Sequence, residues 1–232
     1  MKIHIIYRHY QIEGTDYKNR PKWFNYEKCF INLLNSIKSP EHVQIHVLMD
    51  GKASENFIGK YKQHFTLHEI VAGNDLNSFQ EGYKYAKQLS EQCEEGDLFY
   101  FLENDYLHVY GWDDKVREIF STYSNLDYVS LYDHNDKYFL PQYHDLVSKV
   151  FTTETHHWRT TPSTCGTYIV NKQILLADYD IPFTFPGDHA KFLHLNETRG
   201  RFIITPIPGL STHCMEHLLS PTIDWEKINN NI

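Results

Sequence analysis

Two carboxylates one residue apart, Glu103 and Asp105, directly follow an apolar run at residues 98–102. Such a run is typical of a strand buried on both faces, and alternate residues of a strand point to the same side. In an open α/β sheet, ligands bind in the crevice beyond the carboxyl ends of the strands. Carboxylate oxygens together with substrate phosphates are the ligands that Mg²⁺ or Mn²⁺ prefers. The pattern therefore predicts a site for a divalent cation and a diphosphate, with a solvated acidic turn as the alternative.

The composition limits the classes of partner. A length of 232 residues is enough for one domain with a sizeable core. The formal net charge of −8 disfavours general binding of nucleic acid through its phosphates, so we expect no nucleic-acid partner. An acidic protein that handles a nucleoside diphosphate needs a bridging cation, which agrees with the pattern at Glu103 and Asp105.

Cysteines and apolar runs bear on the compartment. The four cysteines, at positions 29, 93, 165 and 214, form no Cys-x-x-Cys motif, so we expect free, reduced thiols. The first eight residues hold too short an apolar run for a signal peptide, and there is no run of about 18 apolar residues for a membrane span. We expect a soluble, cytoplasmic protein; the sequence does not indicate its oligomeric state.

Strand-like and helix-like segments alternate along the first half of the chain. We expect strands over residues 2–7, 43–49, 66–71 and 98–102, and helices over residues 26–37, 54–64 and 79–93. The start of the third helix is predicted to be capped by Asn77 or Ser78. This order is typical of a largely parallel sheet with right-handed crossovers. In the second half we expect helices over 112–122 and from Asp188, strands over 127–131, 166–170 and 202–205, and a loop-rich section over 133–163.

Several short motifs lie along this framework in a fixed order. They are Asp50 at the end of the second strand, the Asn/Gly-rich loop 73–77, Glu103-Asn104-Asp105, Pro186-Gly187-Asp188-His189, and Pro208-Gly209-Leu210-Ser211-Thr212-His213. The arrangement resembles the GT-A fold of nucleotide-sugar-dependent glycosyltransferases, above all the inverting family-2 type, over most of the chain. Residues 130–134 and 163–167 are also similar to segments of small glycosyltransferases of bacteria and large algal viruses.

The resemblance implies both a fold and an activity. The fold is a single GT-A (Rossmann-like) α/β domain over residues 1–232, with a mixed, mainly parallel central sheet flanked by helices. About 1–105 would form the nucleotide-binding half and about 106–232 the acceptor half. The activity is metal-dependent, inverting transfer of a sugar from a UDP- or TDP-type donor to a hydroxyl of a glycan or another acceptor. The chain lacks the Gln/Arg-x-x-Arg-Trp signature of processive synthases, which favours addition of a single sugar.

The same resemblance assigns the metal and the base. Asp105 and His213 would bind Mn²⁺ or Mg²⁺, while Glu103 would act on the metal through water or on the ribose. Glu103 departs from the family's Asp-x-Asp motif, and no Glu-Asp pair precedes the proposed base. Asp188 would take the proton of the acceptor hydroxyl, with His189 as the alternative base. An aspartate at this place is equally typical of a helix N-cap.

A further set of residues is predicted to contact the nucleotide. The candidates, which turn chemistry or core packing would also explain, are Tyr7, Arg8, Tyr10, Asp50, Asn74, Asn77, Glu103 and Asn104. Within this set an aromatic ring would stack on the base, Arg8 would bind a phosphate, and Asp50 would accept a hydrogen bond from a base N–H. On the acceptor side, Trp112 and Trp158 are candidate sugar platforms, residues 156–159 a candidate substrate loop, and Asp133 and His134 candidate acceptor contacts.

Three alternatives remain open at this stage. His213 and His217 have the i, i+4 spacing of two zinc ligands on one helical face, which would suit a zinc hydrolase, although the order His-Glu-x-x-His is not met. A non-catalytic nucleotide- or glycan-binding module would share the same fold. A nucleotidyltransferase is compatible with the sheet order, but the sequence shows no glycine-rich, basic triphosphate loop after the first strand.

Overall fold

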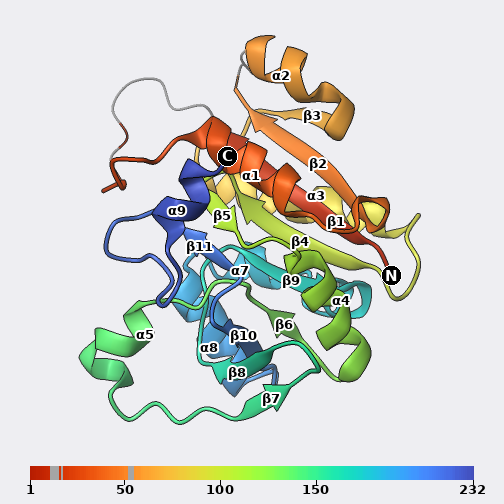
Figure 1. Ribbon diagram of the computed structural model, residues 1–232. Helices are drawn as coiled ribbons and strands as arrows, with labels where there is room; N and C mark the ends of the chain where they lie inside the picture. The colour runs from red at the N-terminus through yellow and green to blue at the C-terminus, as the bar shows by residue number, and fades with distance from the viewer. Residues whose placement is uncertain (11–15, 17, 52–54) are drawn as a thin grey trace.

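A mixed β-sheet runs through the centre of the protein (Figure 1). The computed structural model describes residues 1–10, 16, 18–51 and 55–232. Within them the main sheet has nine strands in the order β3-β2-β1-β4-β9-β6-β10-β8-β7. Their bounds are β1 Ile3–Tyr10, β2 Val43–Asp50, β3 Thr66–Ile70, β4 Leu98–Glu103, β6 Tyr128–Val129, β7 Val150–Thr152, β8 His157–Thr161, β9 Tyr168–Asn171 and β10 Ile203–Ile207.

The sheet changes character from one side to the other. Strands β3, β2, β1 and β4 are all parallel, as predicted for the first half. Beyond β4, strands β9 and β8 run opposite to their neighbours, whereas β6 and β10 pair in parallel. Most strands therefore point the same way, and the fold is the predicted single α/β domain with a mixed, mainly parallel sheet.

Helices cover both faces of this sheet. Their bounds are α1 Tyr26–Ser36, α2 Glu55–Tyr61, α3 Asp75–Ser90, α4 Trp112–Thr122, α5 Asp136–Phe139, α6 Lys172–Ala177, α7 Ile181–Thr184, α8 Asp188–Glu197 and α9 Trp225–Asn230. Short 3₁₀ turns occupy Pro40–His42, Lys62–His64 and Pro141–Tyr143. One hydrophobic core packs α1, α2 and α4 on one face of the sheet, and a second packs α3, α6 and α8 on the other.

Strand β4 lies between these two cores. Leu98, Tyr100 and Leu102 belong to the core on the α1 side, and Phe99 and Phe101 to the core on the α3 side. Each of the five side chains is at most 1% exposed, which confirms that the apolar run is a strand buried on both faces. Burying large apolar side chains on both sides fixes the register of β4 firmly, and so fixes where Glu103 emerges at its carboxyl end.

A second, two-stranded sheet ties the end of the chain to its middle. Strand β5, Tyr106–His108, begins just after Asp105 and pairs antiparallel with β11, Ser211–His213. Their register places His213 opposite Tyr106. The backbone of the C-terminal quarter is therefore hydrogen-bonded beside the predicted metal ligand Asp105.

Several boundaries differ from those predicted. Helix α3 begins at Asp75, four residues earlier than expected, because the Asn74 side chain accepts a hydrogen bond from the backbone N–H of Asn77. The predicted cap at Asn77 or Ser78 is therefore wrong. Residues 156–159, predicted to be irregular, include most of β8, which pairs with β10 and β7. Helix α8 begins at Asp188 itself, and Gly187 occupies the N-cap position without a side-chain bond.

Two further expectations concern cysteines and membranes. All four cysteines are free, as predicted. The Sγ atoms of Cys29 and Cys214 lie 4.0 Å apart in a small apolar cluster beneath α9. None of the helices in the described ranges has both the length and the apolar character needed to cross a membrane.

Candidate functional site

A cavity of about 390 Å³ opens at the carboxyl ends of β1, β2 and β4. This is the edge of a parallel sheet at which α/β proteins bind their ligands. Its lining consists of Arg8, Tyr10, Lys18, Tyr26, Asp50, Gly73, Asn74, Asp75, Ser78, Glu103, Asn104 and Asp105. Six of the predicted nucleotide contacts and one of the two predicted metal ligands are in that set. The structure therefore brings most of these candidates together at one edge of the sheet.

Arg8 forms one wall of the cavity. Its side chain is 5% exposed and donates to the Glu103 carboxylate at 2.7 Å and to the Asp75 carboxylate at 2.8 Å. The guanidinium also lies 5.2 Å from the centre of the Phe79 ring. Because these contacts hold the guanidinium in place, Arg8 presents a fixed positive charge to any phosphate in the cavity.

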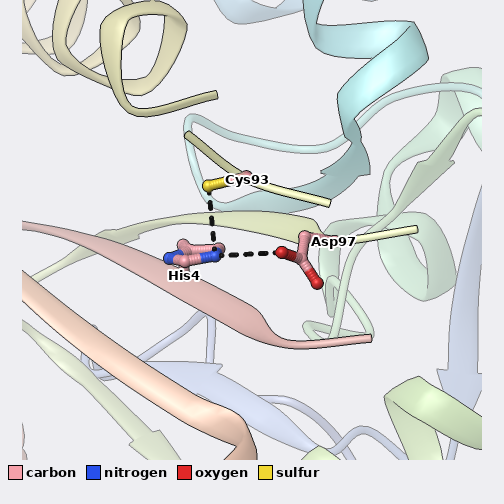
Figure 2. Close-up of side chains that lie close together, drawn as sticks. All are labelled: His4, Cys93 and Asp97. Carbon is pink, nitrogen blue, oxygen red and sulfur yellow. Dashed lines mark hydrogen bonds and ion pairs between the residues drawn. The ribbon is translucent and has the colours of Figure 1, made fainter. Parts of the chain in front are cut away.

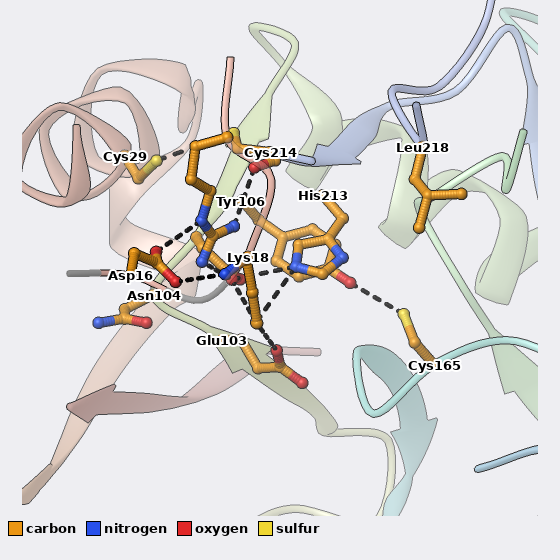
Figure 3. A network of polar contacts seen from close by, with 12 residues as sticks. Asp16, Lys18, Cys29, Glu103, Asn104, Tyr106, Cys165, His213, Cys214 and Leu218 are labelled. Carbon is orange, nitrogen blue, oxygen red and sulfur yellow. Dashed lines mark hydrogen bonds and ion pairs between the residues drawn. The ribbon is translucent and has the colours of Figure 1, made fainter. Parts of the chain in front are cut away.

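Three candidate metal ligands converge beside it. Glu103, Asp105 and His213 each offer a ligand atom, and these atoms lie within 4.8 Å of one another. Figure 3 labels two of these residues, Glu103 and His213. The Nε2 atom of His213 is 3.0 Å from Oδ2 of Asp105. The His213 ring stacks on Tyr106, with centroids 5.0 Å apart and planes 5° apart, so its orientation is fixed.

The surroundings of the Asp105 carboxylate indicate whether a cation fits between Glu103, Asp105 and His213. The residue is 1% exposed, and its Oδ1 atom is buried without a hydrogen-bond partner anywhere in the described residues. A buried carboxylate oxygen normally has a partner, because leaving it unpaired costs free energy. A divalent cation bound by Asp105, Glu103 and His213 would provide that partner, and carboxylate and imidazole donors suit Mn²⁺ or Mg²⁺. The residues present therefore fit such an ion.

Two cations that the sequence analysis missed contact the same carboxylate. Lys18 Nζ and Arg20 Nη2 each donate to Asp105 Oδ2 at 2.8 Å. Burial opposes ionisation of Asp105, but His213, Lys18 and Arg20 outweigh it and hold the pKa of Asp105 well below its usual range. Burial raises the pKa of Glu103, against the opposing charge of Arg8. No local pattern marks Lys18 or Arg20, since both lie more than 80 residues from Asp105 in sequence.

Two of the residues predicted to contact the base, Tyr10 and Asp50, line the cavity. Asp50 is buried and accepts hydrogen bonds from the backbone N–H groups of Ala72 and Gly73 at 2.9 and 3.2 Å. These bonds use part of its acceptor capacity and hold the carboxylate in place at the cavity, which Asp50 lines. Gly73 has a φ of +73°, which allows the chain to turn into Asn74 and the start of α3.

Three more predicted contacts differ in their position. The ring of Tyr10 is 53% exposed on the cavity wall, which leaves a face free for stacking. Asn104 also lines the cavity and donates to the carbonyl of Tyr10 at 2.9 Å. Asn77 is exposed, bonds the Ala72 carbonyl at 3.0 Å, and is absent from the cavity lining, so its observed role is turn structure.

Aromatic residues account for two corrections. Tyr7, predicted to stack on a base, is 2% exposed and packs against Phe30 in the core, so its ring is not available to a nucleotide. Trp158, predicted as a sugar platform, is 0% exposed because β8 places it in the core. Trp112 is buried in that same core at the start of α4, so it serves core packing, which was the alternative to a role as a sugar platform.

The proposed base lies at the start of α8. The Asp188 side chain is 42% exposed and pairs with Lys191 at 2.7 Å. The Lys191 ammonium lies 4.3 Å from the centre of the Phe79 ring, the same ring that Arg8 contacts. Asp188 is therefore linked to the cavity wall through Lys191 and Phe79, although it is not part of the lining. His189 is exposed on the next position of the helix.

The predicted acceptor contact Asp133 is part of a buried polar cluster. Its carboxylate accepts from Arg159 at 2.7 Å and from the hydroxyl of Tyr138 at 2.6 Å. Asp133 is 1% exposed, so these bonds satisfy it internally. This is the hydrogen-bonded loop structure that was the alternative to acceptor binding.

The predicted zinc pair does not form a helical face. His213 ends β11, and residues 214–217 are irregular or turn structure. The i, i+4 spacing of His213 and His217 therefore does not place them on one face of a helix. His213 faces Asp105, whereas His217 contacts Asn19 at 3.3 Å. The interpretation as a zinc hydrolase built on this helix is therefore wrong.

A separate cluster occupies the opposite end of the strands. His4 Nε2 lies 3.3 Å from Cys93 Sγ and 3.6 Å from Asp97 Oδ2 (Figure 2). Asp97 also accepts from the backbone N–H groups of Lys2 and Glu94, and Cys93 donates to the Leu89 carbonyl. These bonds close the turn before β4, which explains the cluster as support for the sheet.

Comparisons with known proteins agree with the fold. No protein-family model and no curated protein sequence matches the chain. Among solved structures, TarS of S. aureus, a glycosyltransferase, matches with a TM-score of 0.52 and 13% identity over 88% of this chain and 35% of TarS. Its fragment 1–349 matches with a TM-score of 0.54 and 14% identity over 88% of this chain and 58% of the fragment.

A second kind of enzyme matches over nearly the whole of both chains. CMP:2-keto-3-deoxy-manno-octonic acid synthetase, solved with CTP, matches with a TM-score of 0.52 and 12% identity over 100% of this chain and 98% of that one. At such identities the likeness concerns the fold alone. It shows that this chain has a GT-A-like α/β fold, as the sequence motifs predicted.

Proposed function

We propose that the protein is a metal-dependent glycosyltransferase that moves a sugar from a UDP- or TDP-type donor to a hydroxyl of a glycan or another acceptor. The observation that supports this most is the convergence of Glu103, Asp105 and His213 beside Arg8 in one cavity. The chain spans 35% of TarS, so the activity rests on the site and not on that likeness.

Each part of the donor has a matching group in the cavity. The exposed ring of Tyr10 would stack on the base, and the remaining acceptor capacity of Asp50 suits a base N–H such as N3 of uracil or thymine. Asn74 and Asn104, at the mouth, would contact the ribose. Arg8 would bind a phosphate oxygen.

Departure of the nucleoside diphosphate requires compensation of its negative charge. A divalent cation held by Asp105, His213 and Glu103 supplies that charge and orients the diphosphate when bound. The fixed guanidinium of Arg8, which is paired with Glu103 beside this position, adds to that positive charge. The low dielectric of a buried site strengthens both effects.

Inversion needs a group that takes the proton of the attacking hydroxyl. Asp188, at the first turn of α8, would serve as that base, with His189 as the alternative. Lys191, which is paired with Asp188, would orient the carboxylate. Because the Asp188 side chain is 42% exposed, an acceptor hydroxyl could approach it from solvent.

A binding panel tests this proposal directly. Thermal unfolding would be measured with UDP, TDP, GDP and CMP, each with Mn²⁺, with Mg²⁺ and with EDTA. A ligand that binds only the folded state raises the melting temperature by mass action. We expect UDP or TDP to raise it with a metal and not with EDTA. Absence of any shift from all four nucleotides would contradict the proposal, and binding without donor cleavage would favour a non-catalytic module.

A nucleotidyltransferase is the second candidate, because the synthetase solved with CTP matches over the whole chain. It would bind a nucleoside triphosphate in preference to a diphosphate. The segment after β1 includes residues 11–15 and 17, which lie outside the described residues, and its sequence contains one glycine. Adding CTP to the panel separates the two candidates, since a shift with CTP and Mg²⁺ that exceeds every diphosphate shift would favour the second.

A further inference from the structure

The ammonium of Lys18 occupies the middle of the candidate metal site (Figure 3). Its Nζ atom lies 2.8 Å from Asp105 Oδ2, 3.4 Å from His213 Nε2 and 3.9 Å from Glu103 Oε2. These are the same three residues whose ligand atoms lie within 4.8 Å of one another. A point within 3.9 Å of all three lies in the space that a cation shared by these ligands would occupy.

A metal ion and this ammonium exclude each other. Divalent ions bind such donors at about 2.0–2.6 Å, which places the ion inside the space that Nζ now fills. Repulsion between the two positive charges acts in the same direction, and the burial of Asp105 keeps solvent from screening it. Binding of the ion therefore requires that Lys18 leave.

Lys18 and Arg20 differ in how firmly they are held. Arg20 also donates to Asp16, to the Cys214 carbonyl and to Tyr26, and its side chain is 9% exposed.

In contrast, every side-chain contact described for Lys18 goes to a candidate metal ligand, and its side chain is 20% exposed on the cavity wall. A lysine carries its charge on a flexible four-carbon stem. Lys18 is therefore the cation that can be displaced, and Arg20 is the one that stays.

We propose that Lys18 is a resident cation that holds the metal position in the nucleotide-free protein and gives way when a nucleoside diphosphate and a divalent ion bind together. The proposal rests on the function proposed above. The diphosphate offers the displaced ammonium new anionic oxygens and offers the ion additional ligands, so both changes favour joint binding. Metal affinity is then low without nucleotide, and free metal does not occupy the site alone.

Direct titration with Mn²⁺ tests this without an activity assay. Free Mn²⁺ would be followed by its electron paramagnetic resonance signal at one fixed pH, with no nucleotide present. The proteins are the wild type, Lys18→Met, Lys18→Gln, and Lys22→Met as a matched control, since Lys22 is exposed and loses the same charge. We expect both Lys18 variants to bind Mn²⁺ at least about ten-fold more tightly than the wild type, and Lys22→Met to match the wild type. Adding Asp105→Asn to Lys18→Met should abolish the gain.

The possible failures are distinguishable. Equal Mn²⁺ affinity of wild type and both Lys18 variants would overturn the role of Lys18. The metal site and the proposed function would survive that result if Asp105→Asn still abolished Mn²⁺ binding and UDP still raised the melting temperature with Mn²⁺. Absence of Mn²⁺ binding by every variant, with or without UDP, would overturn both proposals. Thermal unfolding of each variant verifies that it is folded.

Discussion

Arg8 and Glu103 lie opposite each other in the register of the parallel strands β1 and β4, and their side chains form an ion pair of 2.7 Å. The pair thus links two neighbouring strands at the point where both reach the cavity. Arg8 is 5% exposed and Glu103 retains a 19% exposed side chain. Backbone register and side-chain pairing therefore agree in placing Glu103 next to Asp105 and the metal position.

Removing one member of this pair should be costly. Arg8→Met leaves the Glu103 carboxylate largely buried without its main partner, and we expect a loss of about 3–5 kcal/mol in the free energy of unfolding. Glu103→Gln added to Arg8→Met should recover part of that loss, because the unpaired charge is then gone. Denaturant unfolding of the wild type, both single variants and the double variant measures this. A coupling energy below about 0.5 kcal/mol would contradict the importance of the pair.

Asp105→Asn should remove the metal-dependent part of nucleotide binding. The amide has one oxygen fewer and no negative charge, so it is a poor ligand for a hard cation. We expect the increase in melting temperature that Mn²⁺ and UDP cause, measured for each protein relative to the same protein in EDTA, to disappear in this variant. The melting temperature in EDTA should itself fall, because Lys18 and Arg20 lose their charged partner. Asp145→Asn, at an exposed position, is the matched control. An undiminished Mn²⁺ effect in Asp105→Asn would remove Asp105 from the metal site.

Asp188→Asn should separate binding from transfer. The substitution preserves size but removes the proton acceptor, so donor binding should stay near normal while the rate falls roughly 100- to 10,000-fold. The measurement is release of nucleoside diphosphate from the sugar nucleotide that the binding panel identifies, compared with His189→Asn. Full activity in Asp188→Asn together with loss in His189→Asn would assign the base to His189.

Stability should decrease in mild acid because of buried histidines. Burial lowers the pKa of His9 to about 4, of His46 to about 4 and of His108 to about 3. The unfolded chain, with a histidine pKa of about 6.5, binds protons that the folded protein does not. The contribution of these histidines to the free energy of unfolding is therefore fully present above about pH 6.5. It is lost as the pH falls from there toward 4, by up to about 1.4 kcal/mol per pH unit for each histidine.

Denaturant unfolding between pH 7.5 and 4.5 measures this slope. His108→Gln should flatten it, because one of the three groups no longer takes up a proton on unfolding. His64→Gln, at an exposed position, is the control and should retain the wild-type slope. An identical slope in His108→Gln and in the wild type would show that His108 is protonated equally in both states.

Strong periodicity made much of the fold predictable. Helix α4 has the predicted bounds because its apolar residues are spaced as on one face of a helix, and the residues that flank it end the helix at the same positions. The uninterrupted run in β4 identified the strand that carries Glu103. Strand β8 was missed, since His157–Thr161 is rich in polar residues and forms a strand only by pairing with β10 and β7. Tertiary pairing, which no local pattern encodes, decided that segment.

Local sequence patterns also failed to predict those parts of the site that depend on tertiary contacts. Motif position predicted that Asp50, Glu103 and Asp105 lie together, and all three line the cavity. Asp50 and Glu103 are the last residues of β2 and β4, and Asp105 lies two residues beyond β4. Motif position placed Tyr7 there as well, but alternation along β1 turns that ring toward Phe30 in the core. Lys18 escaped notice because it contacts Asp105 across 87 positions of sequence. Only the folded chain shows which charges meet.

The pairing of β11 with β5 makes the cation site a junction between distant parts of the chain. Asp105 and His213 are 108 positions apart, yet the register that sets His213 opposite Tyr106 brings them to 3.0 Å. Any division of the chain between these two residues leaves each piece with an incomplete set of ligands. Tight binding of Mn²⁺ in the presence of a nucleotide would then require both fragments, so it would show that two complementary fragments had reassembled into the native fold.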